Sequence, residues 1–186
     1  MITFLDACVL YPATLRDVLL TLSEGGLYQI RWSADVLDEM ERNLIKNGRS
    51  DGRVRRIMES AFPDAMVGKD EFSLRIQDMP NHPKDRHVLA AAMACEADIL
   101  VTANLKDFRE LPVNCKAVIK HPDDFLLDQL NDSPRQVLDG LKGMTAYRHV
   151  PLDTTQGTLN ALQKTVPHFV RHAFDSLPRY GTGSPS

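Results

Sequence analysis

Four acidic residues occupy positions at which a parallel α/β sheet would gather them. Asp6 directly follows an apolar, strand-like run, and Asp85 falls in the first turn of a helix-like stretch. Glu39 lies within a second helical pattern, and Asp107 comes five residues after a buried strand-like run. Because ligands bind at the carboxyl ends of the strands in open parallel sheets, we expect these carboxylates to meet there.

Carboxylates brought together in this way need a compensating charge or a proton. Two like charges about 4 Å apart repel by roughly 4 kcal/mol at an effective dielectric constant near 20. The cluster would therefore either hold protons at neutral pH or bind a hard cation such as Mg²⁺ or Mn²⁺. A cation bridged by carboxylates polarises a phosphodiester and stabilises its leaving oxygen, so the chemistry indicated is metal-assisted phosphodiester hydrolysis.

Each acidic residue also has an ordinary structural explanation. Asp85 would stabilise a helix N-terminus, and Glu39 would be a solvated helix residue. Asp107 would belong to a turn in which Asn104 makes a local hydrogen bond. Asp6 fits such an explanation least, since an Asp directly after an apolar strand lies near the end of the sheet. The metal-site hypothesis therefore depends on the joint placement and order of the four residues.

The stretch from Pro80 to Phe108 predicts the elements that would position two of these acids. Val88 and Cys95 are the first and last residues of an apolar face with helical spacing. Residues 99–102 are mostly β-branched and do not alternate with polar residues, as expected of a strand buried on both faces. A helix followed by such a strand is typical of a parallel sheet, so the predicted fold class is α/β.

The rest of the chain predicts further short strands and amphipathic helices. Strands are expected at 2–5, 27–30 (an edge strand), 66–67 and 117–119, and helices at 12–24, from Ser33 onward, 50–62, 72–76 and from Pro122 onward. A turn-forming cluster at 131–134 divides the chain into a first domain, residues 1–130, and a C-terminal extension, residues 131–186. Three helical stretches and no strand are expected in this extension, with a frayed end.

Composition limits the classes of protein that remain. The chain has 186 residues, of which 43% are hydrophobic and 25% charged, as in soluble globular proteins. No apolar run is long enough to span a bilayer and no signal peptide opens the chain, so we expect no membrane association. Three widely spaced cysteines, Cys8, Cys95 and Cys115, indicate buried thiols in a reducing cytoplasm. A net charge of −3 means that any contact with nucleic acid needs a local basic patch.

Four short motifs contain the acidic residues. They are Ile2-Thr3-Phe4-Leu5-Asp6-Ala7, Ser33-x-x-Val36-Leu37-x-Glu39, Asp85-x-x-Val88-Leu89-Ala90-x-Ala92 and Leu100-Val101-Thr102-x-Asn104-x-x-Asp107-Phe108. In this order they resemble the motifs of PIN-domain ribonucleases, and most of all those of the VapC-type toxins of bacterial toxin–antitoxin pairs. The resemblance covers residues 1 to about 130 and ends with His121-Pro122-x-x-Phe125-Leu126. Residues 131–186 resemble the helical C-terminal extension of a subset of VapC-type proteins.

The resemblance implies a three-layer α/β/α PIN-like fold with a central, mostly parallel sheet, and endonucleolytic cleavage of RNA with Mg²⁺ or Mn²⁺. It also implies an RNA substrate such as tRNA or rRNA, an antitoxin protein whose tail fills the active-site groove, and commonly a homodimer. The metal-binding, catalytic residues would be Asp6, Glu39, Asp85 and Asp107, with Thr102 and Asn104 in support. The hydroxyl residue often found after the first acid is Ala7 here, which removes one polar contact.

Two other groups of residues offer further candidates for binding or catalysis. The densest basic run contains Lys46, Arg49, Arg53, Arg55 and Arg56. It would contact the RNA backbone, or equally form a solvated helix face. His82 and His87 flank Asp85, but a two-metal site needs no histidine base, so neither is included among the predicted site residues.

Three alternative functions remain at this point. A housekeeping, RNA-processing PIN nuclease would use the same acids. A Mg²⁺-binding phosphoacceptor signalling domain would need paired acids beside the first strand, where only Asp6 lies, and a lysine after a late strand, for which Lys120 is a partial match. A PIN scaffold without catalysis is disfavoured by the intact carboxylates.

Overall fold

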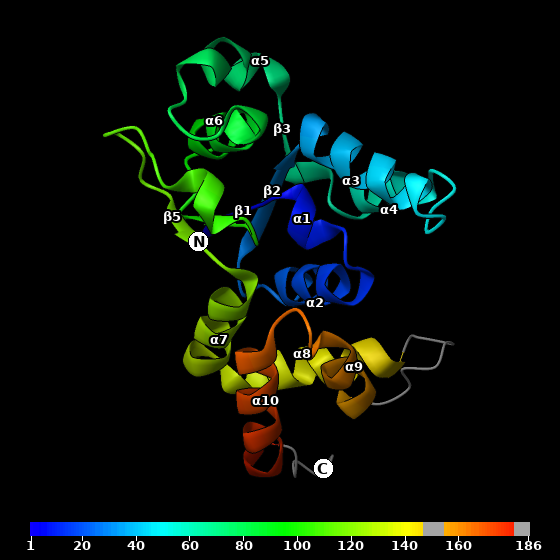
Figure 1. The fold of residues 1–186 in the computed structure, drawn as a ribbon. Coiled ribbons are helices and arrows are strands. Elements are labelled where there is room, and N and C mark those ends of the chain that lie inside the picture. Colours follow the sequence, from blue (N-terminus) through cyan, green and yellow to red (C-terminus); the bar gives the residue numbers. More distant parts are fainter. Residues whose placement is uncertain (147–154, 181–186) are drawn as a thin grey trace. The chain divides into compact units, whose positions relative to one another are not determined.

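The structure is a computed structural model that describes residues 1–146 and 155–180. These residues form two compact units, each built from two separate parts of the chain (Figure 1). The first unit contains Met1–Pro12 and Tyr28–His121, and the second contains Ala13–Leu27 and Pro122–Ser186. The predicted frayed end and residues 147–154 lie outside the described residues.

The first unit is organised around a five-stranded sheet in which every pair of neighbouring strands is parallel. Its order is β3-β2-β1-β4-β5. The strands are β1 (Ile2–Leu5), β2 (Gln29–Ser33), β3 (Met66–Val67), β4 (Ile99–Val101) and β5 (Val118–Lys120). The expectation of an edge strand at 27–30 is wrong, because β2 starts at Gln29 and is covered on its outer side by the two-residue strand β3.

The central strands are buried on both faces, as their unbroken apolar sequences predict. Phe4 and Leu5 of β1 and Leu100 and Val101 of β4 have no exposed surface. Val118 of the edge strand β5 is 54% exposed. Burial therefore follows position in the sheet, and the ends of β1 and β4 lie in its buried centre.

Helices connect the strands and cover both faces of the sheet. They are α1 (Ala7–Leu10), α3 (Ala34–Lys46), α4 (Arg53–Ala61), α5 (Lys69–Phe72) and α6 (Arg86–Ala94), with 3₁₀ turns η1 (Pro63–Ala65), η2 (Ser73–Asp78), η3 (Pro83–Asp85) and η4 (Leu105–Phe108). The chain runs from β1 to β3 in one direction along the sheet and then returns to β4. Since parallel crossovers are right-handed, α3 and α6 lie on opposite faces (Figure 1). The predicted three-layer α/β/α PIN-like fold is thus confirmed.

Several predicted helix boundaries differ from those of the structure. The helix expected from the first turn at Pro83 begins instead as the 3₁₀ turn η3, and α6 starts only at Arg86. The helix expected at 72–76 is the end of α5 followed by η2. Cys95 is the C-cap residue of α6 and only partly buried, rather than a member of the helix's buried face. As predicted, Ser33 caps α3, because its hydroxyl accepts a hydrogen bond from the Val36 N–H at 3.3 Å.

The second unit is entirely helical in its described residues. Its helices are α2 (Ala13–Glu24), α7 (Pro122–Asp132), α8 (Pro134–Ala146), α9 (Thr155–Leu162) and α10 (Pro167–Tyr180). Helix α2 packs against α8 and α9, and α10 packs against α7, α8 and α9. At Gly140 of α8, an added Cβ would lie 3.0 Å from Leu22 of α2, so the two helices approach closely there. The compact units divide at residues 121–122, whereas the sequence placed the division at 131–134.

Membrane-spanning helices are absent from residues 1–146 and 155–180, since none of the helices there combines the necessary length and apolarity.

Candidate metal centre

The register of the central strands places Asp6 beside Thr102. Leu5 of β1 pairs with Val101 of β4, and the Asp6 N–H donates to the Val101 carbonyl at 3.1 Å. Asp6 follows β1 and is 4% exposed, and Thr102 follows β4 and is 0% exposed. The carboxyl ends of β1 and β4 therefore bring an acid and a hydroxyl together in a buried position, as the sequence predicts for Asp6.

Both carboxylate oxygens of Asp6 are held by hydrogen bonds. Oδ1 accepts from the Ala7 N–H at 2.6 Å, and Oδ2 accepts from the Thr102 hydroxyl at 2.7 Å. The Cys8 thiol also donates to Oδ2, at 3.1 Å, and accepts from the Ala103 N–H. Burial, followed by the negative charge of Asp6, raises the pKa of Cys8 to about 12. Cys8 is therefore a neutral thiol that orients Asp6, and it supplies a polar contact of the kind that Ala7 lacks.

Three further side chains converge next to this pair. The ligand atoms of His82, Asp85 and Asp107 all lie within 4.8 Å of one another, and the His82 Nδ1 is 3.8 Å from Asp85 Oδ2. The backbone ties the segments together, since the His82 N–H donates to the Asp107 carbonyl at 3.1 Å. His82 caps η3, Asp85 ends it and Asp107 lies in η4, so these two turns offer two carboxylates and an imidazole to a single ion.

The carboxylate of Asp85 interacts electrostatically with all three of the other predicted acids. Its pKa is raised to about 6, first by burial and then by the negative charges of Asp6, Asp107 and Glu39. His82 acts in the opposite direction. Asp85 is the N-cap residue of α6, yet its side chain makes no capping hydrogen bond. The carboxylate therefore faces an acidic environment and leaves the helix end uncapped, which the ordinary explanation of Asp85 would not predict.

A cavity of about 790 Å³ joins the remaining site residues. Glu39 of α3, Asp85, Asp107 and the exposed Asn104 all line it. A second cavity of about 550 Å³ shares Glu39, Arg42 and His87 with the first. The structure thus brings together all six predicted residues, with Asp6 and Thr102 buried beside the strands and the other four around the cavity.

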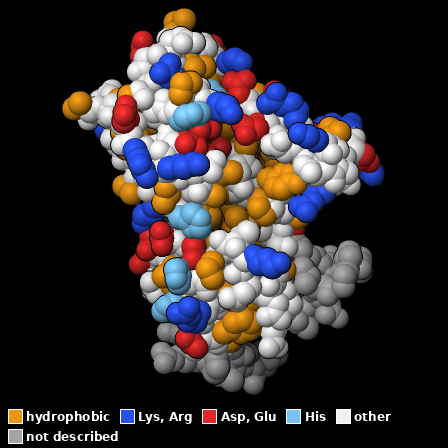
Figure 2. Space-filling view, viewed as in Figure 1, with side chains coloured by type: hydrophobic (Ala, Val, Ile, Leu, Met, Phe, Trp, Pro, Cys, Tyr) orange, Lys and Arg blue, Asp and Glu red, His pale blue; other side chains and the backbone are white. Residues whose placement is uncertain are grey.

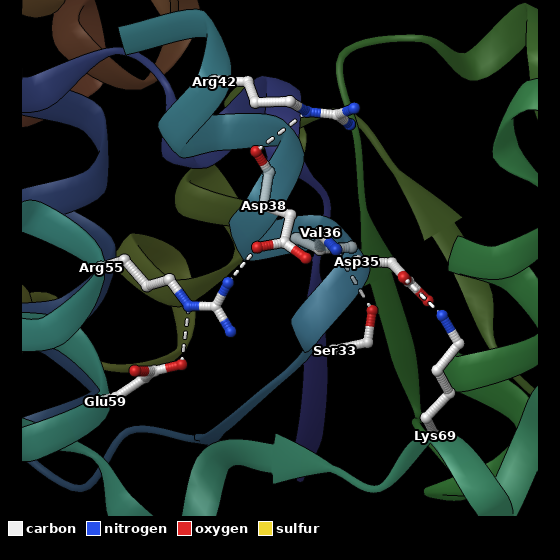
Figure 3. Close-up of polar contacts among 8 residues, drawn as sticks. All are labelled: Ser33, Asp35, Val36, Asp38, Arg42, Arg55, Glu59 and Lys69. Atoms are coloured by element: carbon white, nitrogen blue, oxygen red, sulfur yellow. Dashed lines mark hydrogen bonds and ion pairs between the residues drawn. The ribbon is translucent and has the colours of Figure 1, made fainter. Parts of the chain in front are cut away.

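The predicted RNA-contacting arginines lie elsewhere in the first unit. Arg55 pairs with both Asp38 and Glu59 (Figure 3), and Arg53 pairs with Asp51 at 2.7 Å. The Arg49 guanidinium lies 5.4 Å from the centre of the Tyr11 ring. None of these arginines, nor Arg56, lines the cavity that contains the acids.

Some residues at this centre were not predicted. The sequence prediction does not include His82 among the site residues, although it lies three positions before Asp85. Cys8 was assigned only to packing, although it lies two positions after Asp6. Lys84 and Lys106 also line the cavity, and each directly precedes one of the acids in the sequence, which is the signal that would have found them.

The sequence of this chain matches known protein families over most of its length. Residues 3–106 match the model of the PIN domain family, so the match covers more than half of the chain. This chain is a PIN domain protein. In this PIN domain protein, residues 122–173 also match the model of the VapC50 C-terminal domain, which confirms the resemblance to VapC-type proteins with a C-terminal extension.

One curated relative is a Mycobacterium tuberculosis (strain ATCC 25618 / H37Rv) protein described as "Putative ribonuclease VapC50". This PIN domain protein is 43% identical to it over an alignment of 117 positions, and the alignment covers 58% of the chain and 66% of the relative. The match thus spans just under two thirds of the length of that relative. No solved structure matches the chain.

Replacing Thr102 with Val should weaken divalent-cation binding by about 10- to 100-fold, because partners that orient a metal ligand typically contribute that much. Val keeps the branched shape of Thr but cannot donate to Asp6 Oδ2. Titration of Mn²⁺ into the purified protein measures the change. Thr102→Ser keeps the hydroxyl and should retain most of the affinity; equal affinity in all three proteins would show that this hydrogen bond does not prepare the site.

Proposed function

We propose that this protein is an endoribonuclease that cleaves RNA phosphodiester bonds at a carboxylate-bound Mg²⁺ or Mn²⁺ site. The observation that carries the proposal is the convergence of ligand atoms: those of His82, Asp85 and Asp107 lie within 4.8 Å of one another, and Glu39 lines the same cavity. Burial, and then the negative charges of Asp6, Asp107 and Glu39, raise the pKa of Asp85, and a divalent cation would offset this negative charge. The PIN family match supports the same reading.

The residues present fit a hard divalent cation. The donor atoms are mainly carboxylate oxygens, which Mg²⁺ and Mn²⁺ prefer, with one imidazole that suits Mn²⁺ better than Mg²⁺. Asp85, Asp107 and His82 would hold the ion directly, and Glu39 and Asp6 would contribute charge and further oxygens. A cation bound there would supply Lewis acidity at the phosphodiester and positive charge for the leaving oxygen.

The protein's own groups have separate tasks in this reaction. Thr102 and Cys8 fix the direction of the Asp6 carboxylate, so it needs no rearrangement when an ion or a substrate arrives. Asp85 must lose its proton before it can serve as a ligand, since a coordinating carboxylate is ionised. Asn104, at the edge of the cavity, is placed to donate a hydrogen bond to a phosphate or a ribose hydroxyl.

The biological role proposed here is that of a toxin in a toxin–antitoxin pair, working in the cytoplasm as a homodimer. The supporting observations are the match of residues 122–173 to the VapC50 C-terminal domain model and the similarity to a relative named VapC50, beside the PIN domain match of residues 3–106. A housekeeping PIN nuclease would share the same site. The phosphoacceptor alternative has less support, because its lysine, Lys120, does not line the cavity of the acids.

Incubation of purified protein with total cellular RNA tests the proposal. Discrete fragments in Mn²⁺ that are lost in EDTA are expected, and sequencing of their ends would identify the substrate. RNA that stays uncut by folded protein free of any bound inhibitor would contradict the assignment. Inhibition by a protein encoded next to this one would separate the toxin role from a housekeeping role.

A further inference from the structure

Four basic side chains line the same cavity as the acidic cluster. Arg42 and Lys46 come from α3, Lys84 from η3 and Lys106 from η4. On the face seen in Figure 2, acidic side chains gather in the upper part, with lysine and arginine side chains around them. A protein with a net charge of −3 therefore concentrates positive charge next to its proposed metal centre.

These four charges are available to a ligand. Across residues 1–146 and 155–180, none of the four side chains forms an ion pair, and the one hydrogen bond of Arg42 goes to the Asp38 backbone carbonyl at 3.2 Å. In α4, by contrast, Arg53 and Arg55 are paired with carboxylates. The difference is visible in Figure 3, where Arg55 lies between the carboxylates of Asp38 and Glu59, whereas Arg42 contacts only the backbone carbonyl of Asp38.

The two cavities that share Arg42 provide an extended path on this side of the first unit. Their volumes, about 790 and 550 Å³, are each in the range that holds one small ligand, which is large enough for a nucleotide. No Phe, Tyr or Trp side chain is among the described residues that line either cavity. Stacking of bases on such rings, the usual source of base contacts to single strands, is therefore absent, and the lining favours phosphates.

We propose that Arg42, Lys46, Lys84 and Lys106 hold the phosphates that flank the cleaved bond of single-stranded RNA. The proposal rests on the ribonuclease function proposed above and assigns the contacts that place the RNA at the acids. It predicts binding that depends strongly on salt and weakly on base sequence. Each phosphate contact to a single strand contributes about 0.7 to the slope of log affinity against log salt concentration, so the four together contribute about 2.8.

The test compares two quadruple variants of the full chain, both carrying Asp85→Asn so that the RNA stays intact. The first replaces Arg42, Lys46, Lys84 and Lys106 with Gln. The second variant has the same net charge as the first, because it replaces four other basic residues with Gln: Arg49, Arg53, Arg56 and Lys116. None of these four lines the cavity. Binding of a fluorescent, unstructured oligoribonucleotide is measured by anisotropy between 50 and 200 mM KCl, with circular dichroism as a check of folding.

The parent protein carrying Asp85→Asn alone should lose about 50-fold more affinity over this salt range than the cavity variant, since a fourfold salt change raised to the power 2.8 gives that ratio. The second variant should keep most of the parent's salt dependence. Equal slopes in the two variants, or a flat slope only in the second, would overturn the proposal while the ribonuclease function stands. Failure of the folded parent to bind RNA, together with failure of the native protein to cut it, would overturn both.

Discussion

Replacing Asp85 with Asn is expected to reduce metal-dependent RNA cleavage by roughly 1000-fold. A metal site supplies several kcal/mol of transition-state stabilisation, and each 1.36 kcal/mol corresponds to a factor of ten in rate. Asn has nearly the shape of Asp, but it lacks the charge and is a poor ligand for Mg²⁺ or Mn²⁺. Asp85 is the acid on which the charges of Asp6, Glu39 and Asp107 converge, so its loss should affect the whole cluster.

A matched control and a second measurement make this prediction specific. Asp124→Asn removes an exposed carboxylate in α7 and should leave cleavage unchanged. Because folding raises the pKa of Asp85 from 3.8 to about 6, ionisation of this residue lowers the stability of the metal-free fold progressively between about pH 4 and pH 6, and the full cost is present above pH 6. Asp85→Asn should therefore raise the melting temperature in EDTA at pH 8 but not at pH 4. Cleavage that survives Asp85→Asn would mean that other residues hold the metal.

Lowering the pH from 7 to 5 is expected to weaken Mn²⁺ binding by about tenfold. With a pKa of about 6, Asp85 is mostly ionised at pH 7 and mostly protonated at pH 5, and a proton competes with the metal for the same carboxylate. Isothermal titration of Mn²⁺ into the protein at several pH values measures this change. An affinity that stays constant between pH 7 and pH 5 would show that Asp85 is ionised throughout and does not bind the metal.

Two variants assign the pH dependence to its source. His82 and Asp107 are the other ionisable ligands within 4.8 Å of Asp85, and His82 is the one that is not a carboxylate. His82→Gln removes the imidazole, so a pH dependence that persists in this variant belongs to the carboxylates. Asp85→Asn should bind Mn²⁺ more weakly at every pH and lose most of the pH dependence.

The buried strands and the positions of Asp6 and Thr102 at their ends show how much could be predicted from the sequence alone. Residues 2–5 and 99–101 are unbroken apolar runs, so a two-sided, buried, parallel sheet follows from their composition, and acids placed after strands then meet at one edge. Asp85 was also assigned to the site, although the first turn of its helix proved to be 3₁₀. Local pattern was enough here because each residue lies within a few positions of a strand or helix end.

Contacts that depend on side-chain direction could not be predicted in this way. The Cys8 thiol reaches Asp6 only because α1 begins at the very end of β1, which turns position 8 back toward the strand. The arginines of α4 are predicted either to contact RNA or to form a solvated helix face, and the sequence could not show that Arg55 pairs with Asp38, which is far from it in the chain. The helices that pack against α2 could not be predicted from the sequence either. Its apolar face could pack against any apolar surface; it consists of Leu15, Val18, Leu19 and Leu22.

The placement of α2 with the late helices has a consequence for biosynthesis. Ribosomes make α2 long before α7, α8 and α9 exist, so its apolar face stays without its native cover while the strands of the first unit are being completed. A nascent chain, or one truncated after residue 121, is therefore expected to expose the apolar face of α2 to solvent. The last third of the polypeptide covers the apolar face of a helix translated near the start. We therefore expect the second unit to fold only after its final helices have left the ribosome.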